Sequence, residues 1–112
     1  MRIGELSHQS GVSRRALRYY EEQGLLVPQR GCNGYREYAD DAALIVSQIQ
    51  RLYLSGLNSE AIRRYLPCAR GQTPQLEMCA ELRAHLLSRA AALDDDAQTA
   101  ARQRDVLLGH LA

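Results

Sequence analysis

The chain has 112 residues, enough for one small domain with an extension but too few for two full hydrophobic cores. Aromatic residues make up only 5% of it and all six are tyrosines, which argues against one compact core along the whole length. The formal net charge is +1, but residues 1–38 hold six arginines against four acidic residues, whereas residues 73–112 hold four against six. The N-terminal part is therefore the better candidate for binding a negatively charged partner.

No apolar run is long enough to span a membrane, and the first residues lack the apolar stretch of a secretory signal. We therefore expect a cytoplasmic protein with no membrane partner, whose three cysteines are reduced. Nothing in the sequence predicts an enzyme. The three histidines are scattered, no glycine-rich phosphate loop occurs, and no serine or cysteine has a recognisable base.

Two short helices separated by a tight turn are predicted at the N-terminus. Ile3 and Leu6 have helical spacing in the first helix, and Gly11 supplies the turn. Ser13 is a preferred N-cap residue for the second helix, which we expect to end near Gly24. This order of elements is that of a helix-turn-helix, whose second helix lies in the major groove of DNA.

The second helix carries the residues that best indicate function. Three arginines share one side of it, and two adjacent tyrosines follow them. Guanidinium groups bind phosphates and guanine edges, and phenol hydroxyls bind backbone oxygens, so we predict a DNA-binding protein. The residues concerned are Ser13, Arg14, Arg15, Arg18, Tyr19 and Tyr20.

A small β-hairpin is predicted next. Residues 25–27 are compatible with a strand, residues 35–38 alternate aromatic and charged side chains, and Asn33–Gly34 is a strong hairpin-turn signal. We interpret this hairpin as a wing attached to the helix-turn-helix.

Two further helices follow the wing. The third is predicted over about residues 40–54 and is ended by Gly56. Asn58 then caps a short fourth helix, which we expect Pro67 to end. The inward residues of the third helix are expected to be Leu44, Ile45, Ile49 and Leu52.

From residue 75 onward a heptad of apolar positions is kept over five repeats, with no proline and no glycine before Gly109. The pattern predicts a helix of ~50 Å at about 1.5 Å per residue, whose apolar stripe needs a second copy to cover it. The chain thus divides into a DNA-binding domain, residues 1–70, and a coiled-coil dimerisation helix, residues 75–112. The expected dimer contacts are Leu76, Cys79, Leu86, Ala90, Leu93, Ala97, Ala100, Leu107 and Leu111.

Several segments of the first 66 residues together match a known family. They are Ile3-Gly4-Glu5-Leu6, Gly11-Val12-Ser13, Leu17-Arg18-Tyr19-Tyr20-Glu21, Gly24-Leu25-Leu26 and Gly34-Tyr35-Arg36-Glu37-Tyr38. With them the chain resembles bacterial regulators of the mercury-resistance (MerR) family. The resemblance implies a mainly α fold, with a winged helix-turn-helix, a small β-hairpin wing and a long C-terminal helix that dimerises as an antiparallel coiled coil. It also implies a homodimer that binds and distorts a near-palindromic promoter site, together with RNA polymerase.

The resemblance also implies DNA contacts residue by residue. The second helix would bind bases and phosphates in the major groove, and the wing and third helix would bind flanking phosphates. The first set is Arg14, Arg15, Arg18, Tyr19 and Tyr20, and the second is Tyr35, Arg36, Tyr38 and Arg51. Tyr20 could equally be a core aromatic that holds the wing, and Tyr38 could pack between the wing and the third helix.

The chain ends soon after the long helix, so we expect neither the ligand-binding domain nor the cysteine-bearing loop that other family members carry there. No cofactor is then required. Cys79 matches a cysteine near the start of this helix in mercury-sensing relatives. In an antiparallel pair centred near Asp95, Cys68, Cys79 and the second copy's His110 could form a soft-metal site. Alternatively, the two cysteines close a disulfide under oxidation, or Cys79 only packs as a small hydrophobe.

Two other functions compete with a regulator. An excisionase-like or architectural DNA-bending protein would also carry a winged head, but such proteins tend to be short and the long helix argues against one. A coiled-coil adaptor whose head binds protein would ignore DNA, whereas a regulator binds DNA with an affinity that falls as salt rises.

Overall fold

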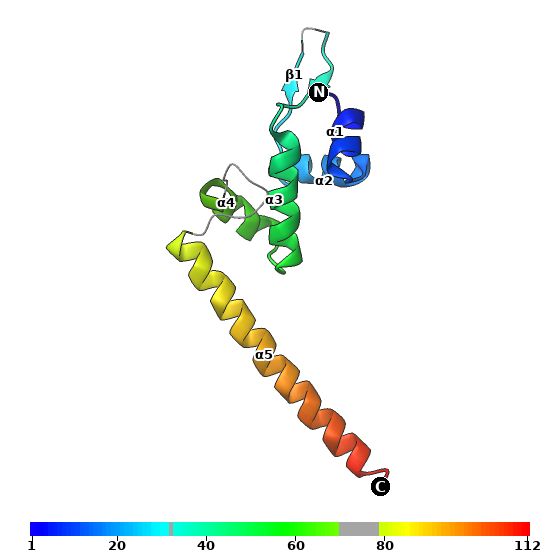
Figure 1. The fold of residues 1–112 in the computed structure, drawn as a ribbon, viewed down its shortest axis with the longest axis vertical. Coiled ribbons are helices and arrows are strands. Elements are labelled where there is room, and N and C mark those ends of the chain that lie inside the picture. The colour runs from blue at the N-terminus through cyan, green and yellow to red at the C-terminus, as the bar shows by residue number, and fades with distance from the viewer. Residues whose placement is uncertain (32, 70–78) are drawn as a thin grey trace. The chain divides into compact units, whose positions relative to one another are not determined.

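The computed structural model describes residues 1–31, 33–69 and 79–112. The chain divides into two compact units, Met1–Met78, called the head below, and Cys79–Ala112. In Figure 1 the described part of the head runs from blue to green, and the second unit runs from yellow to red.

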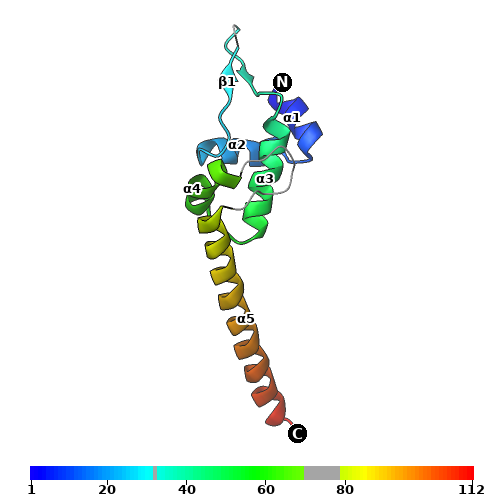
Figure 2. The same cartoon turned by 60° about the vertical axis from the view of Figure 1, so that its left-hand side comes forward.

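The described part of the head contains helices α1 (Ile3–Ser10), α2 (Arg14–Glu22), α3 (Ala42–Leu54) and α4 (Ser59–Ala69). Helix α3 is central, because α1 and α4 both pack against it, and α1 also packs against α2 (Figures 1 and 2). Each fully buried aliphatic side chain stabilises the fold by roughly 1.5–3 kcal/mol. Side chains with no exposed surface come from all four helices: Leu6, Leu17, Val46, Ile49, Leu52 and Ile62.

Several of the predicted helix starts and stops are present. Ser13 Oγ accepts a hydrogen bond from the Ala16 N–H at 3.1 Å, and Asn58 Oδ1 accepts one from the Ala61 N–H at 2.9 Å. Gly11 after α1 and Gly56 after α3 have φ of 72° and 84°, a left-handed conformation that glycine adopts without steric cost. These local signals fix where the helices begin and end.

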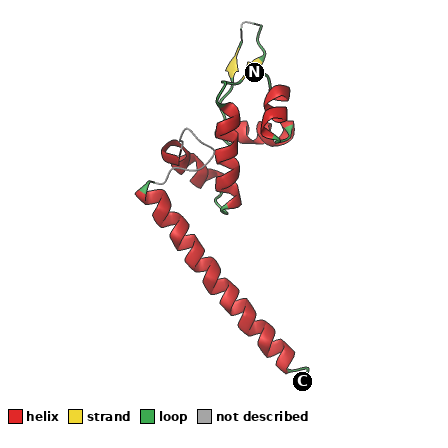
Figure 3. Cartoon of the chain, viewed as in Figure 1, coloured by secondary structure: helices red, strands yellow, loops and turns green. Residues whose placement is uncertain are grey.

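The wing is a two-stranded antiparallel hairpin of β1 (Gln29–Arg30) and β2 (Arg36–Glu37), with Arg30 paired to Arg36 (Figure 3). The predicted first strand at residues 25–27 is wrong. Leu25 and Leu26 are buried, and their N–H groups donate to the Tyr20 carbonyl at the end of α2. Two consecutive leucines are more stable in the core than in an exposed hairpin, so polar residues further along form the strand.

The predicted end of the fourth helix at Pro67 is also wrong, because α4 continues to Ala69. A proline in the last turn removes only one hydrogen bond to a carbonyl four residues earlier, and its fixed φ is compatible with a helix. Cys68, expected in a loop, therefore lies in α4.

The second unit contains helix α5 (Ala80–Gly109), which at about 1.5 Å per residue is ~45 Å long. Cys79, expected inside the helix on the apolar stripe, is instead its N-cap, and its Sγ accepts a hydrogen bond from the Leu82 N–H at 3.4 Å. The thiol takes the place of the hydroxyl or carboxylate that commonly caps a helix. The predicted helix start at residue 75 and Leu76 lie outside the described residues.

The predicted apolar stripe is largely exposed on this chain. Leu93, Leu107 and Leu111 are 55%, 65% and 82% exposed. Within the described ranges, no helix combines the length and apolar character needed to cross a membrane.

Candidate nucleic-acid interface

The turn between α1 and α2 is held by side chains as well as by backbone. Ser7 Oγ donates to the Val12 carbonyl at 2.7 Å, and the Val12 N–H donates to Ser10 Oγ at 3.2 Å. The Val12 side chain is buried. A turn fixed at these points fixes the direction of α2, as a helix that must fit a DNA groove requires.

Helix α2 has a buried side and an exposed, strongly basic side. Leu17 faces the core, whereas Arg14, Arg15 and Arg18 are exposed. Tyr19 is 47% exposed on the same helix. The structure therefore places the predicted arginines where a nucleic acid can contact them.

Arg14 lies over the backbone of α1. A Cβ built on Gly4 would be only 2.7 Å from Arg14 Nη2, so the missing side chain at Gly4 makes room for the guanidinium. This contact was not predicted from the sequence. The available signal was a glycine within a helix, where alanine is more stable.

Tyr20 is buried in the head, which supports the alternative interpretation of it as a core aromatic. Its ring stacks on that of Tyr53, with ring centroids 5.7 Å apart and planes inclined by 20°. Burial, and then Tyr53, raise the pKa of the Tyr20 hydroxyl above its ordinary value. Tyr20 stays neutral and supports α2 from within.

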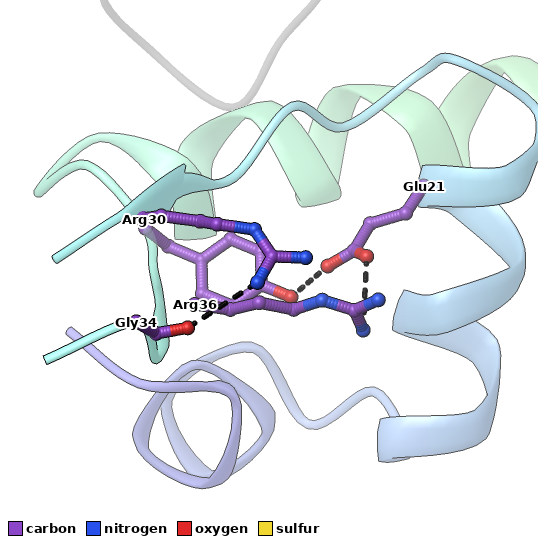
Figure 4. Close-up of polar contacts among 5 residues, drawn as sticks. Glu21, Arg30, Gly34 and Arg36 are labelled. Carbon is purple, nitrogen blue, oxygen red and sulfur yellow. Dashed lines mark hydrogen bonds and ion pairs between the residues drawn. The ribbon is translucent and has the colours of Figure 1, made fainter.

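Glu21 joins α2 to the wing. Its carboxylate accepts a hydrogen bond from the Tyr38 hydroxyl and pairs with Arg36, with Arg36 Nη1 3.3 Å from Glu21 Oε2 (Figure 4). Tyr38 is only 3% exposed, and its N–H also donates to the Met1 carbonyl at 2.6 Å. Tyr38 therefore packs at the base of the wing against α2 and the start of the chain, whereas the alternative interpretation places it between the wing and the third helix.

The pKa of the Tyr38 hydroxyl is raised well above 10. Burial is the largest cause, followed by the hydrogen bond to Glu21. The hydroxyl therefore keeps its proton at neutral pH and remains a donor to Glu21. The wing is attached to α2 through a neutral donor, a carboxylate and a guanidinium.

The outer part of the wing is exposed and basic. Tyr35 is 58% exposed, and the Arg36 side chain is 49% exposed even though it pairs with Glu21. Arg30 Nη1 donates to the Gly34 carbonyl at 3.4 Å across the hairpin (Figure 4). The guanidinium of Arg2 lies over the Tyr35 ring, 4.5 Å from its centroid, and Arg2 is a residue that the sequence analysis did not select.

Arg51 and Tyr19 line the same surface hollow of about 700 Å³ beside α2 and α3. Arg51 is exposed, and the structure brings this predicted contact of the third helix beside Tyr19 of α2. The remaining lining residues are Tyr20, Ser47, Gln50, Tyr53 and Leu54.

Two of the predicted sensor residues, Cys79 and His110, lie at opposite ends of α5. Cys79 is partly exposed at the start of α5, and His110 is exposed at its C-cap. The Cys68 side chain and all of Cys32 lie outside the described residues. Among the residues that the structure does describe, no three His, Cys, Asp or Glu side chains form a group that could hold a metal ion.

Residues 1–68 match the family model of MerR HTH family regulatory proteins. The chain belongs to this family. The HTH-type transcriptional regulator HmrR of Rhizobium leguminosarum bv. viciae is 42% identical over 66 residues, which are 59% of this chain and about half (51%) of that relative. HmrR of Sinorhizobium medicae is 34% identical over 104 residues, 88% of this chain and 71% of the relative. The crystal structure of the lead(II) complex of PbrR691 from Ralstonia metallidurans CH34 matches with a TM-score of 0.72 and 26% identity, covering 96% of this chain and 81% of that one.

These matches confirm the resemblance seen in the sequence segments, and they confirm the predicted fold of a mainly helical chain with a two-stranded wing and a long C-terminal helix. The matched family and these relatives are transcription regulators rather than enzymes, as the sequence predicts for this chain.

Proposed function

We propose that this MerR-family protein is a homodimeric transcription regulator that binds and distorts a near-palindromic promoter site. The observation that carries the proposal is the exposed arginine row on α2, held by a capped, hydrogen-bonded turn and flanked by a basic wing. Guanidinium groups on a protruding helix suit guanine edges and phosphates, and a neighbouring wing suits the adjoining backbone.

The proposed DNA contacts come from α2, from the wing and from Arg51 of α3. Arg14, Arg15 and Arg18 bind in the major groove, and Tyr19 and Arg51 bind the backbone beside it. Tyr35 and Arg36 of the wing bind flanking phosphates. Ser13 contributes by capping α2, and Tyr20 and Tyr38 contribute by holding α2 and the wing in place.

Dimerisation covers the exposed leucines of α5 with a second, antiparallel copy. A row of leucines more than half exposed is a surface that a soluble chain commonly buries against a partner. The twofold dimer would set its heads one helical turn apart, about 34–36 Å. Distorting the DNA between them costs of order 1–6 kcal/mol, which the contacts of both heads offset, and RNA polymerase acts on the distorted promoter.

The signal that we propose is a thiol-reactive agent or a soft metal ion, because a relative binds lead(II) and Cys79 stands partly exposed at the start of α5. In the antiparallel dimer, Cys79 and Cys68 would bind the metal with His110 of the partner subunit. Cys79→Ser keeps an N-cap residue and removes the thiol. We expect this variant to bind DNA like the parent but to lose its response to lead(II), and an unchanged response would exclude Cys79 as a ligand.

The test of the DNA-binding proposal is a gel-shift titration on promoter DNA with the parent, Arg18→Ala and Arg102→Ala. Arg102 is an exposed arginine of α5, so its loss changes the net charge equally without touching the head. We expect Arg18→Ala to weaken binding by roughly 1–3 kcal/mol and Arg102→Ala to bind like the parent. Equal affinity of Arg18→Ala and the parent would show that α2 is not the DNA-binding helix.

The second candidate is an excisionase-like or architectural DNA-bending protein without an effector. Such a protein would carry a winged head similar to that of this chain. The observation against it is α5, whose thirty residues have no role in a monomeric bending protein. Binding of a single, non-palindromic site by monomers would favour this candidate over the regulator.

A further inference from the structure

A small hollow of about 210 Å³ lies where the start of the chain, α2 and the wing come together. Its lining residues, which we call the arginine notch, are Arg2, Ile3, Arg18, Tyr35 and Arg36. Three segments that are separate in the sequence each contribute one arginine to it. No single motif marks such a site.

The notch is positively charged even after its acidic neighbour is counted. Glu21 pairs with Arg36, but the Glu21 carboxylate also accepts the Tyr38 hydroxyl and is 11% exposed. Arg2 and Arg18 remain exposed, and Arg18 is near enough to Tyr38 to act on its pKa in the lowering direction. A phosphate group, which carries a negative charge on several oxygens, suits these three arginines, because each guanidinium can bind phosphate oxygens with two N–H groups.

Arg2 is oriented before any ligand binds. Its guanidinium stacks over the Tyr35 ring, 4.5 Å from the centroid, and its side chain makes no capping hydrogen bond to α1. Stacking on an aromatic face restricts a long side chain and leaves its N–H groups free to donate at the edge. An arginine held this way loses less freedom when it binds an anion.

We propose that the arginine notch binds one phosphate of the DNA backbone and that Arg2, positioned by Tyr35, is a phosphate ligand. The inference rests on the proposed function, because it takes DNA as the ligand. The notch lies between α2, the helix assigned to the major groove, and the wing. A DNA backbone that passes from α2 to the wing would cross it. Of the three arginines assigned to the major groove, Arg18 is then the one that contacts a phosphate rather than a base edge.

The experiment compares Arg2→Gln, Arg2→Lys and the charge-matched control Arg102→Gln, in full-length protein, on operator and non-operator duplexes over a range of salt. A contact with one phosphate contributes about 0.9 to the slope of log affinity against log salt, or about 8-fold in affinity at 0.1 M salt, for each head. We expect Arg2→Gln to lose this factor on both duplexes alike, Arg2→Lys to regain part of it, and Arg102→Gln to match the parent. Tyr35→Leu should weaken binding by a larger factor in the parent than in the Arg2→Gln background, because only the parent also loses the orientation of Arg2.

The possible outcomes distinguish a failure of the notch proposal from a failure of the proposed function. Should Arg2→Gln match Arg102→Gln while Arg18→Ala loses affinity, the notch would be refuted and the regulator would stand. A loss confined to the operator would also overturn the assignment, because a phosphate contact does not distinguish sequences. A parent protein that binds neither duplex would refute the proposed function itself.

Discussion

At the scale of single residues, Glu21 shows how the two DNA-facing elements are made into one surface. It belongs to α2, but its carboxylate contacts the wing, through a hydrogen bond from Tyr38 and an ion pair with Arg36. Because the carboxylate is nearly buried, these contacts are screened less by water than exposed pairs are. The wing is thereby attached to α2.

The raised pKa of Tyr38 leads to a prediction about pH. The folded chain holds this proton more tightly than the unfolded chain, so the stabilisation is complete below pH 10 and is lost as pH rises above 10. Tyr38→Phe should lower the free energy of unfolding at neutral pH by roughly 1.5–3 kcal/mol, because it removes a hydrogen bond to a charged group. Urea unfolding should be measured at pH 7 and above pH 10. The free energy of unfolding should fall less with this rise in pH in the variant than in the parent. Parallel losses in the two proteins would contradict the assignment.

The contact between Gly4 and Arg14 gives a variant that separates stability from binding. Gly4→Ala places a methyl group 2.7 Å from Arg14 Nη2, so the guanidinium must move, while alanine favours the helix by up to ~1 kcal/mol. We expect a melting temperature equal to or above the parent's and an operator affinity lowered about 5-fold. In the Arg14→Ala background the same change should have no effect on affinity. A further loss there would show that Gly4 acts by another route.

At the scale of elements, the sequence predicts best what depends on neighbouring residues. The caps at Ser13 and Asn58 and the glycine after α3 are local signals, and all of them are present. Two predictions are wrong for different reasons: packing decided the first wing strand, whereas the predicted end of α4 fails because a proline in the last turn removes only one hydrogen bond. Leu25 and Leu26 are drawn into the core, and α4 continues past its proline.

The candidate nucleic-acid interface shows the same contrast between features that local sequence predicts and features that depend on packing. The arginine row of α2 follows from helical spacing alone, whereas the burial of Tyr38 and the stacking of Arg2 on Tyr35 require the wing to fold back beside the start of the chain. Contacts between residues more than thirty positions apart leave no pattern in one sequence. They are the part of the site that could not be predicted.

Helix α5 gives a prediction for dimerisation. Leu86→Asp with Leu93→Asp places two charges on the proposed apolar stripe, where pairing would bury them without partners. We expect monomers in sedimentation velocity and a large loss of operator affinity. The matched control, Ser88→Asp with Ala91→Asp, adds the same charge away from the stripe on exposed positions and should remain dimeric. A dimer in the first variant would mean that the stripe is misassigned.

At the scale of the whole molecule, the proposal requires two heads to act on one site. A single head offers a short basic helix and a wing, which is a small surface for specific binding. Two heads joined through α5 double the contacts and fix their separation, so a near-palindromic site becomes the preferred target. The exposed leucines of α5 are the feature of this chain that calls for this arrangement.

The most direct test is a hydroxyl-radical footprint of the protein on DNA upstream of its own gene. A dimeric promoter-binding regulator should give two symmetric protected segments with centres about one helical turn apart, and altered reactivity between them where the DNA is distorted. Arg18→Ala should abolish both segments at the same protein concentration. Absence of protection by the parent, or one asymmetric segment that survives in the Leu86→Asp, Leu93→Asp variant, would contradict a dimeric promoter-binding regulator.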